Sequence, residues 1–291
     1  MLPENKYHLC LNKSILKISG SDRFKFLQGM VSNDLEILKK DNSIYCAFLT
    51  PQGKFLYDFY IINHKNFYYL ECLKKKEDEI INKFQLYKLR AEVNFNKMQD
   101  MVCILVNNNL QKKFDQNTIE NFIYFPDPRN NKFFLKGFCQ KSSIKSLQKE
   151  FGLSKIDQNC YEKIRISNTI PEAEKDIKVG KTLLLEARFD KLNGISWEKG
   201  CYIGQEVTAI TNYRGKLKKQ IYGVKIEGKI SSNEITYNGK NIGILTSHMD
   251  DYGIALLNIN ETENCINQTQ NLKSNEALLN PFNPNWVSDS N

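Results

Sequence analysis

Long hydrophobic runs are missing from this chain of 291 residues. Its longest uninterrupted apolar stretch, Met101–Val106, has six residues, whereas a helix that spans a bilayer needs about twenty. The first residues lack a basic segment followed by an apolar one, and they are not rich in Arg and Ser, so neither a secretory signal nor a transit peptide is indicated. We expect a cytoplasmic protein, or a protein of the mitochondrial matrix if the host is eukaryotic.

Closely spaced metal ligands are also scarce. The chain has eight cysteines, of which the two nearest, Cys139 and Cys160, are 21 residues apart, and it has only three histidines. This spacing argues against a zinc site, a ferredoxin-type cluster site and a thioredoxin motif. Dispersed thiols favour a reducing compartment, and we expect no resident metal.

Nucleotide-binding glycine loops, zinc-protease motifs and nucleophile-elbow motifs are absent as well. The net charge of +8 comes from 41 Lys and Arg against 33 Asp and Glu, which is compatible with a nucleic acid or an anionic ligand, or simply with a solvated lysine-rich surface. No RNA-binding motif accompanies the charge. We therefore expect no specific nucleic acid partner.

Local patterns predict mixed strands and helices. The first half reads as a strand at 14–20, a helix around Phe24, Leu27 and Val31, a hairpin at 45–62 that turns at Thr50–Gly53, and a helix at 75–89. Strands are predicted at 101–106, 220–226, 241–246 and 253–259, the last three forming a small all-β module. From Glu261 the chain is polar and rich in Asn and Ser, which is typical of a tail.

The densest motif is Lys199-Gly-Cys-Tyr-Ile-Gly-Gln-Glu206. Two glycines flank Cys201 and permit close approach of a ligand, and a nearby ammonium such as that of Lys199 favours a thiolate. Gln205 and Glu206 offer an amide and a carboxylate suited to the edge of a heterocycle. The alternatives are that Cys201 is a small buried hydrophobe in a turn and that Glu206 is a structural salt-bridge partner.

This motif, followed by Tyr213-Arg-Gly215, resembles the signature of the YgfZ-type folate-binding proteins, which are relatives of the glycine cleavage T-protein (aminomethyltransferase) and are linked to iron–sulfur cluster assembly and repair. The resemblance extends to Phe26-Leu-Gln-Gly29 with Ser32-Asn-Asp34, to Leu49-Thr-Pro-Gln-Gly-Lys54 with Asp58, and to the block Arg165–Pro171. Two departures stand in that last block. Thr169 occupies a place where many members have glycine, and Ser167 a place where the T-protein is acidic.

The resemblance implies an α+β, ring-like fold of three domains of the T-protein (GcvT)/YgfZ type. A discontinuous first domain, which binds folate, would comprise residues 1–45 and 155–212. A ferredoxin-like domain would be inserted at 46–154, a small C-terminal β-barrel would occupy 213–262, and 263–291 would be a polar tail.

The implied ligand is tetrahydrofolate. A pterin needs aromatic walls and a few polar groups at its edge, and the expected cofactor-binding residues are Tyr161, Trp197, Tyr202, Gln205, Glu206, Tyr213 and Arg214. Each aromatic residue could equally belong to the core. Arg214, Lys216, Lys218 and Lys219 either hold the glutamate tail of the folate or form a solvated basic turn.

The resemblance favours a monomeric accessory factor for iron–sulfur enzymes, including tRNA-modifying ones. Its partners would be folate and client enzymes, and Cys201 and Lys199 would be its reactive residues. Two alternatives stay open. A folate-dependent aminomethyl transferase would need a carboxylate beside the folate, and only Asp58 lies in a suitable strand. An RNA-binding module has the charge alone in its favour. Classical aminomethyl transfer is not expected.

Overall fold

The computed structural model describes residues 2–116, 122–213, 215 and 217–288. These residues form two compact units. The first comprises Met1–Phe48, Tyr57–Gln158 and Asn193–Ile203, and the second comprises Leu49–Leu56, Asn159–Leu192 and Gly204–Asn291. The tip of one hairpin in the first half of the chain thus belongs to the second unit.

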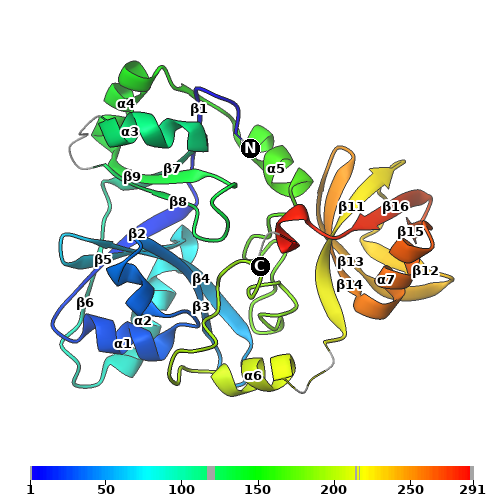
Figure 1. The fold of residues 1–291 in the computed structure, drawn as a ribbon, viewed down its shortest axis with the longest axis horizontal. Coiled ribbons are helices and arrows are strands. Elements are labelled where there is room, and N and C mark those ends of the chain that lie inside the picture. The colour runs from blue at the N-terminus through cyan, green and yellow to red at the C-terminus, as the bar shows by residue number, and fades with distance from the viewer. Residues whose placement is uncertain (1, 117–121, 214, 216, 289–291) are drawn as a thin grey trace. The chain divides into compact units, whose positions relative to one another are not determined.

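One sheet of the first unit has five strands in the order β3-β4-β5-β2-β6 (Figure 1). Helices α1 (Arg23–Met30) and α2 (Glu77–Lys88) accompany it, and the aromatic rings of Phe26, Phe48 and Phe59 all contact Phe84 of α2. The strands are β2 (Lys13–Ser19), β3 (Ser43–Leu49), β4 (Phe55–His64), β5 (Phe67–Leu73) and β6 (Asn94–Lys97). The predicted hairpin and both predicted helices are confirmed here.

The other sheet of this unit has the order β10-β1-β7-β9-β8. Its core gathers Phe114 of α3 (Gln111–Gln116) and Leu147 of α4 (Ile144–Phe151) with the strand residues Ile104 and Leu135. The strands are β1 (Lys6–Leu9), β7 (Met101–Val106), β8 (Ile123–Pro126), β9 (Leu135–Gln140) and β10 (Ser154–Lys155). Strand β1, which has only four residues, had no counterpart in the sequence prediction.

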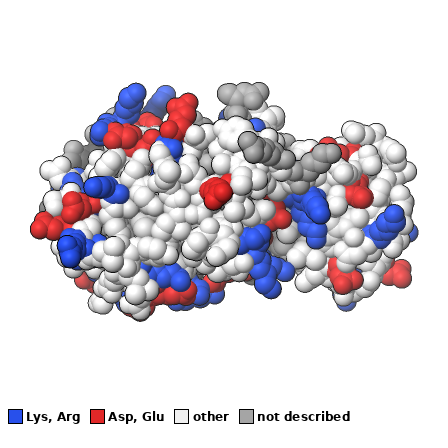
Figure 2. Space-filling view, turned by 90° about the horizontal axis from the view of Figure 1, so that it is seen from below, with Lys and Arg blue, Asp and Glu red and all other residues white. Residues whose placement is uncertain are grey.

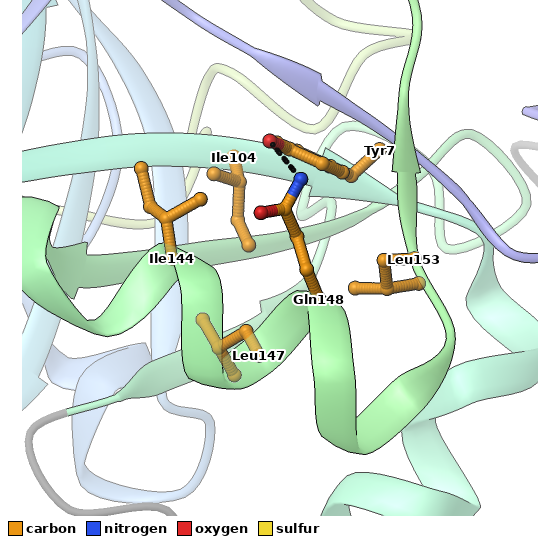
Figure 3. Close-up of a pocket in the computed structure, with 6 residues that line it drawn as sticks. All are labelled: Tyr7, Ile104, Ile144, Leu147, Gln148 and Leu153. Atoms are coloured by element: carbon orange, nitrogen blue, oxygen red, sulfur yellow. Dashed lines mark hydrogen bonds between the residues drawn. The ribbon is translucent and has the colours of Figure 1, made fainter.

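A recess lies between α4 and this sheet. Figure 3 shows it lined by Tyr7, Ile104, Ile144, Leu147, Gln148 and Leu153. The Gln148 side-chain amide donates a hydrogen bond of 3.1 Å to the Tyr7 hydroxyl. The recess has no room for a water-sized molecule, so we regard it as part of the core packing rather than as a ligand pocket.

The second unit carries a closed barrel in the order β11-β14-β13-β12-β15-β16 (Figure 1). Its strands are β11 (Lys219–Glu227), β12 (Glu234–Tyr237), β13 (Lys240–Met249), β14 (Tyr252–Asn258), β15 (Leu272–Ser274) and β16 (Ala277–Phe282). The helices of this unit are α5 (Gln158–Ser167), α6 (Gln205–Tyr213) and α7 (Ile259–Asn267). The described residues also contain five short 3-10 helices: Leu35–Lys39, Lys74–Lys76, Asn108–Leu110, Lys141–Ser143 and Asn285–Val287.

The expected fold class, α+β with a small C-terminal β-barrel, is confirmed. The expected polar tail at 263–291 is wrong, because β15 and β16 are barrel strands and Trp286 is buried. Leu272 and Leu279 belong to the barrel core, whereas Lys273 and Asn275 between them are exposed. These strands have three and six residues, too short for their alternation to stand out in an Asn-rich segment.

Candidate functional site

The motif begins at the end of residues 168–204, a stretch without helices or strands, and its last two residues, Gln205 and Glu206, open α6. Cys201 is exposed, Cys160 is half-buried and the other six cysteines are buried. Reactivity of a thiol requires access as well as a suitable pKa. Cys201 is thus the cysteine that a reagent or partner reaches most readily, and the alternative of a buried turn residue is excluded for it.

The loop that carries Cys201 is attached to the C-terminal end of α1. The last four carbonyl groups of a helix have no partner within the helix. The Lys199 ammonium donates to the carbonyl oxygens of Gln28 and Val31 at 2.7 Å each, and to that of Asn33 at 2.8 Å. The backbone N–H of Ile203 donates to the Gly29 carbonyl at 3.2 Å. A cation at this position also complements the negative end of the helix dipole.

The start of the same loop is held by Ser32 and Asn33, two buried polar residues directly after α1. The Ser32 hydroxyl donates to the Gly194 carbonyl at 2.6 Å, and the Asn33 amide donates to the Asn193 carbonyl at 2.7 Å. The Ser196 N–H in turn donates to the Ser32 carbonyl at 3.0 Å. We call residues 193–203, held in this way, the Cys201 loop. The sequence alone did not assign this anchoring role to the Phe26–Gly29 and Ser32–Asp34 blocks.

Lys199 is buried, and burial lowers its pKa to about 8, although the nearby Cys46 and Asp34 act in the opposite direction. An ammonium has three donors, and here all three go to backbone carbonyls. Its nitrogen also lies 5.1 Å from the centre of the buried Tyr202 ring. This geometry makes Lys199 a positioning residue of the Cys201 loop, rather than the reactive residue that the sequence suggested.

In the second unit, Gly204 begins the segment that leads into α6. It has φ +80°, and a Cβ atom there would lie 2.4 Å from the Thr50 carbonyl oxygen and 2.8 Å from Leu49 Cβ. Gly53, at the turn of the same hairpin, packs against Val207 of α6. The two sequence blocks that contain Thr50–Gly53 and Gly204 therefore meet at backbone contact distance, which explains why glycine stands at 204.

Helix α6 presents polar and aromatic groups to solvent. Tyr213 is 71% exposed and Glu206 is exposed. Within the described residues, neither Gln205 nor Glu206 makes a side-chain hydrogen bond or an ion pair. Glu206 is thus not the salt-bridge partner that was the alternative. Its carboxylate and the Gln205 amide are available to a ligand.

The other expected aromatic residues differ in exposure. Trp197, in the Cys201 loop, is 38% exposed, whereas Tyr161 and Tyr202 are buried. The Tyr161 hydroxyl donates to Glu172 at 2.5 Å, so this ring is part of the α5 packing. The structure places Trp197, Lys199, Cys201 and Tyr202 in the first unit and Tyr161, Gln205, Glu206 and Tyr213 in the second.

Of the expected basic cluster, Arg214 and Lys216 lie outside the described residues. Lys218 and Lys219 are exposed. On the face drawn in Figure 2, basic and acidic side chains are interspersed rather than segregated. That distribution is typical of an ordinary solvated surface.

The block Arg165–Pro171 is structural. The buried Arg165 guanidinium donates to Asp176 at 2.6 Å, to the Ile170 carbonyl at 2.9 Å and to Glu162 at 2.9 Å. Thr169 stands where many proteins of the resembled family have glycine. It has φ +53°, a left-handed conformation that favours glycine. Asp58 on β4 is buried and accepts a hydrogen bond of 3.0 Å from the Tyr45 hydroxyl.

Comparisons with known proteins agree with this description. Residues 218–289 match the family model "CAF17, C-terminal beta-barrel domain". The chain is 29% identical over 226 residues to "Iron-sulfur cluster assembly factor IBA57 homolog, mitochondrial" of Neurospora crassa, and this alignment covers 72% of this chain and 51% of that protein. It is 25% identical over 273 residues to the mouse IBA57 (84% and 75%), and 27% identical over 229 residues to "tRNA-modifying protein YgfZ" of Hamiltonella defensa (72% and 66%).

The alignments span 51% to 62% of the length of the first four of these relatives. Among solved structures, glycine cleavage system aminomethyltransferase T from Bartonella henselae matches with a TM-score of 0.79 at 10% identity, covering 98% of this chain and 86% of that one. None of the described helices is long and apolar enough to cross a membrane. The chain is therefore a relative of the IBA57 and YgfZ proteins, as its motif predicted, with the fold of the aminomethyltransferase T and a CAF17-type C-terminal barrel.

Proposed function

We propose that this chain is a tetrahydrofolate-binding accessory protein for the assembly or repair of iron–sulfur enzymes, tRNA-modifying ones included, and that Cys201 is its functional thiol. The observation that carries the proposal is the Cys201 loop. Its exposed cysteine is held by a buried lysine with three carbonyl partners. The names of the relatives suggest that the cargo is an iron–sulfur cluster, since IBA57 is called an iron–sulfur cluster assembly factor.

A single cysteine can contribute one thiolate to a cluster, whereas a stable cluster needs about four such ligands. Cys201 therefore acts with thiolates of a client protein, and the cluster is cargo in passage. The anchored loop supports this role, because a ligand that must meet a partner's cysteines gains from being held in one position before the encounter. We propose a monomer in the mitochondrial matrix if the host is eukaryotic, or in the cytoplasm otherwise.

The residues on α6 fit a pterin in their chemistry. Gln205 can donate and accept, Glu206 can accept from the amino-pyrimidine edge, and the exposed Tyr213 ring can cover an aromatic face. Tetrahydrofolate, when bound, supplies a carrier of one-carbon units. The part of these residues is to bind and orient it. The buried Tyr161 and Tyr202 belong to the packing of their own units.

The role of Cys201 is tested by cluster transfer to an apo client enzyme with the Cys201→Ala variant. We expect this variant to fold with wild-type stability and to lose transfer. Cys160→Ala, which removes a half-buried thiol in α5, is the matched control and should transfer normally. Undiminished transfer by Cys201→Ala would overturn the assignment of the thiol.

Folate binding is tested by calorimetric titration with tetrahydrofolate, together with an aminomethyl-transfer assay on a lipoylated carrier protein. We expect binding without turnover. Glu206→Gln should weaken binding about tenfold, as the loss of a charged hydrogen bond does, whereas Glu198→Gln, at an exposed position of the Cys201 loop, should not. Turnover would favour the transferase alternative, and absence of binding would remove folate from the proposal.

A further inference from the structure

Two buried cysteines lie opposite each other in the first unit, away from the Cys201 loop. Strand β1 pairs antiparallel with β7, with Leu9 opposite Ile104, so the next pair in this register is Cys10 and Cys103. The Cys10 N–H donates to the Cys103 carbonyl at 2.9 Å. Residues paired in this way have Cα atoms about 5.5 Å apart, within the roughly 4.4–6.8 Å that a disulfide requires.

The two thiols also interact through their side chains. The pKa of Cys103 is raised well above its ordinary value, mainly by burial and next by a hydrogen bond with the Cys10 thiol. The Cys103 thiol further donates to the Glu71 carboxylate at 3.2 Å, and Glu71 is paired with the Lys136 ammonium at 3.0 Å. Both charged partners are buried. Glu71 lies on β5 of the other sheet, so the cluster brings two thiols, a proton acceptor and a counter-charge together where the two sheets of the first unit meet.

We propose that Cys10 and Cys103 are a reversible dithiol–disulfide pair, a modification site separate from Cys201. The oxidant is a small-molecule disulfide of the glutathione type. Cys10, which is 7% exposed against 1% for Cys103, becomes accessible when the short strand β1 opens, attacks the small disulfide and passes its proton to the small thiol that leaves. Cys103 then attacks the mixed disulfide, its proton passing to Glu71 and on to the second departing thiolate. The two protein thiols lose two electrons and two protons, and one small disulfide becomes two small thiols.

The consequence for the fold is a covalent link between β1 and β7. Strand β1 has four residues and stands between β7 and the two-residue β10, so its opening is opposed by few hydrogen bonds. A bond from Cys10 to Cys103 prevents β1 from separating from β7. Oxidation would therefore rigidify the N-terminal strand without using the Cys201 thiol.

The test equilibrates the full chain in glutathione buffers of increasing oxidised fraction, traps free thiols with an alkylating reagent under denaturing conditions and maps the peptides. We expect a Cys10–Cys103 linked peptide, a mass loss of about 2 Da, reversal by reductant, and amide exchange in β1 slowed at least tenfold. Cys10→Ser should abolish the link, whereas Cys139→Ser, a buried thiol on the neighbouring strand β9, should leave it intact.

The decisive measurement uses the wild-type chain, so it does not depend on the folding of a variant. The proposal is overturned if Cys10 and Cys103 remain free thiols across the whole range of buffers. A glutathione adduct confined to Cys201 would overturn it as well. The result is independent of folate binding and of cluster transfer.

Discussion

At the scale of single residues, Lys199 illustrates how position in space decides a role. A lysine two residues from a cysteine suggests thiolate activation, yet its ammonium is directed at the end of α1. Burying an ammonium is costly unless every donor is used, and the three carbonyl groups meet that condition. Lys199 therefore acts on Cys201 indirectly, by fixing the conformation of the loop that carries it.

We expect Lys199→Met to lower the free energy of unfolding by about 3 kcal/mol, because three buried carbonyl groups lose their partner. It should also change the alkylation rate of Cys201, because the loop is released. Urea denaturation and pulse alkylation measure the two effects. Glu198→Gln, at an exposed neighbour, should stay within about 0.5 kcal/mol of wild type. Wild-type stability of Lys199→Met would contradict the anchoring role.

Gly204 offers a second test at this scale. Gly204→Ala should cost about 2–4 kcal/mol, since its Cβ atom would meet the Thr50 carbonyl at a backbone conformation that L-residues disfavour. Gly200→Ala is the matched control, because a Cβ atom at 200 has no heavy atom within 4 Å. Thermal or urea unfolding of the two variants compares them directly, and equal stabilities would refute the contact.

At the scale of elements, the barrel depends on its last two strands. Strand β16 pairs with both β11 and β15, and β15 pairs with β12, so these strands close the sheet and leave no free edge. Each alone is short, and its stability comes from cross-strand pairs and the shared core. The two strands that the sequence analysis assigned to a polar tail are thus required to close the barrel.

Leu279→Ala should destabilise the barrel by about 2–5 kcal/mol, because its side chain is fully buried in the barrel core. Leu278→Ala provides the control on the same strand, since Leu278 points to the other face and is only half-buried. Hydrogen exchange of the β11 amides should accelerate in the first variant only. Similar losses in both variants would argue against the observed register.

At the scale of the whole molecule, protonation couples many buried groups to stability. Burial raises the pKa of Cys72 to about 12 and that of Cys139 to about 11, and raises those of Cys46 and Cys103 as well. The folded chain keeps these four protons at pH values where the unfolded chain, with ordinary thiols, has released them. Lys199, with its pKa lowered to about 8, acts in the opposite sense.

Stability should therefore be unaffected by these thiols below about pH 8.5 and fall as the pH rises through 9, the ordinary pKa of a thiol. The thiols with a raised pKa outnumber this one lysine, so the slope of the unfolding free energy against pH is negative above about pH 9. Urea midpoints between pH 7.5 and 10.5, in the presence of reductant, measure it. Cys139→Ser should reduce the slope by about 1.4 kcal/mol per pH unit, and a flat profile would contradict the burial of the thiols.

The sequence by itself determined the features that depend on neighbouring residues. Alternating and helical patterns located the hairpin with its turn at Thr50–Gly53, both helices of the first sheet and three barrel strands, because these signals are contained within a dozen residues. The motif around Cys201 was sufficient to identify the relatives, because a motif is recognised from its residue types and spacing alone. Neither the periodic patterns nor the motif indicates which residues distant in sequence are in contact.

Only the tertiary structure decided the role of Lys199, the closure of the barrel by β15 and β16, and the pairing of Cys10 with Cys103. Gln28 and Lys199 are 171 positions apart along the chain, and no periodicity links such positions. Short strands gain their stability from partners rather than from their own propensity, so a four-residue or three-residue strand is decided by the sheet that receives it. Contacts between residues distant in sequence likewise hold the loop of the exposed Cys201 and place the buried Cys10 and Cys103 opposite each other.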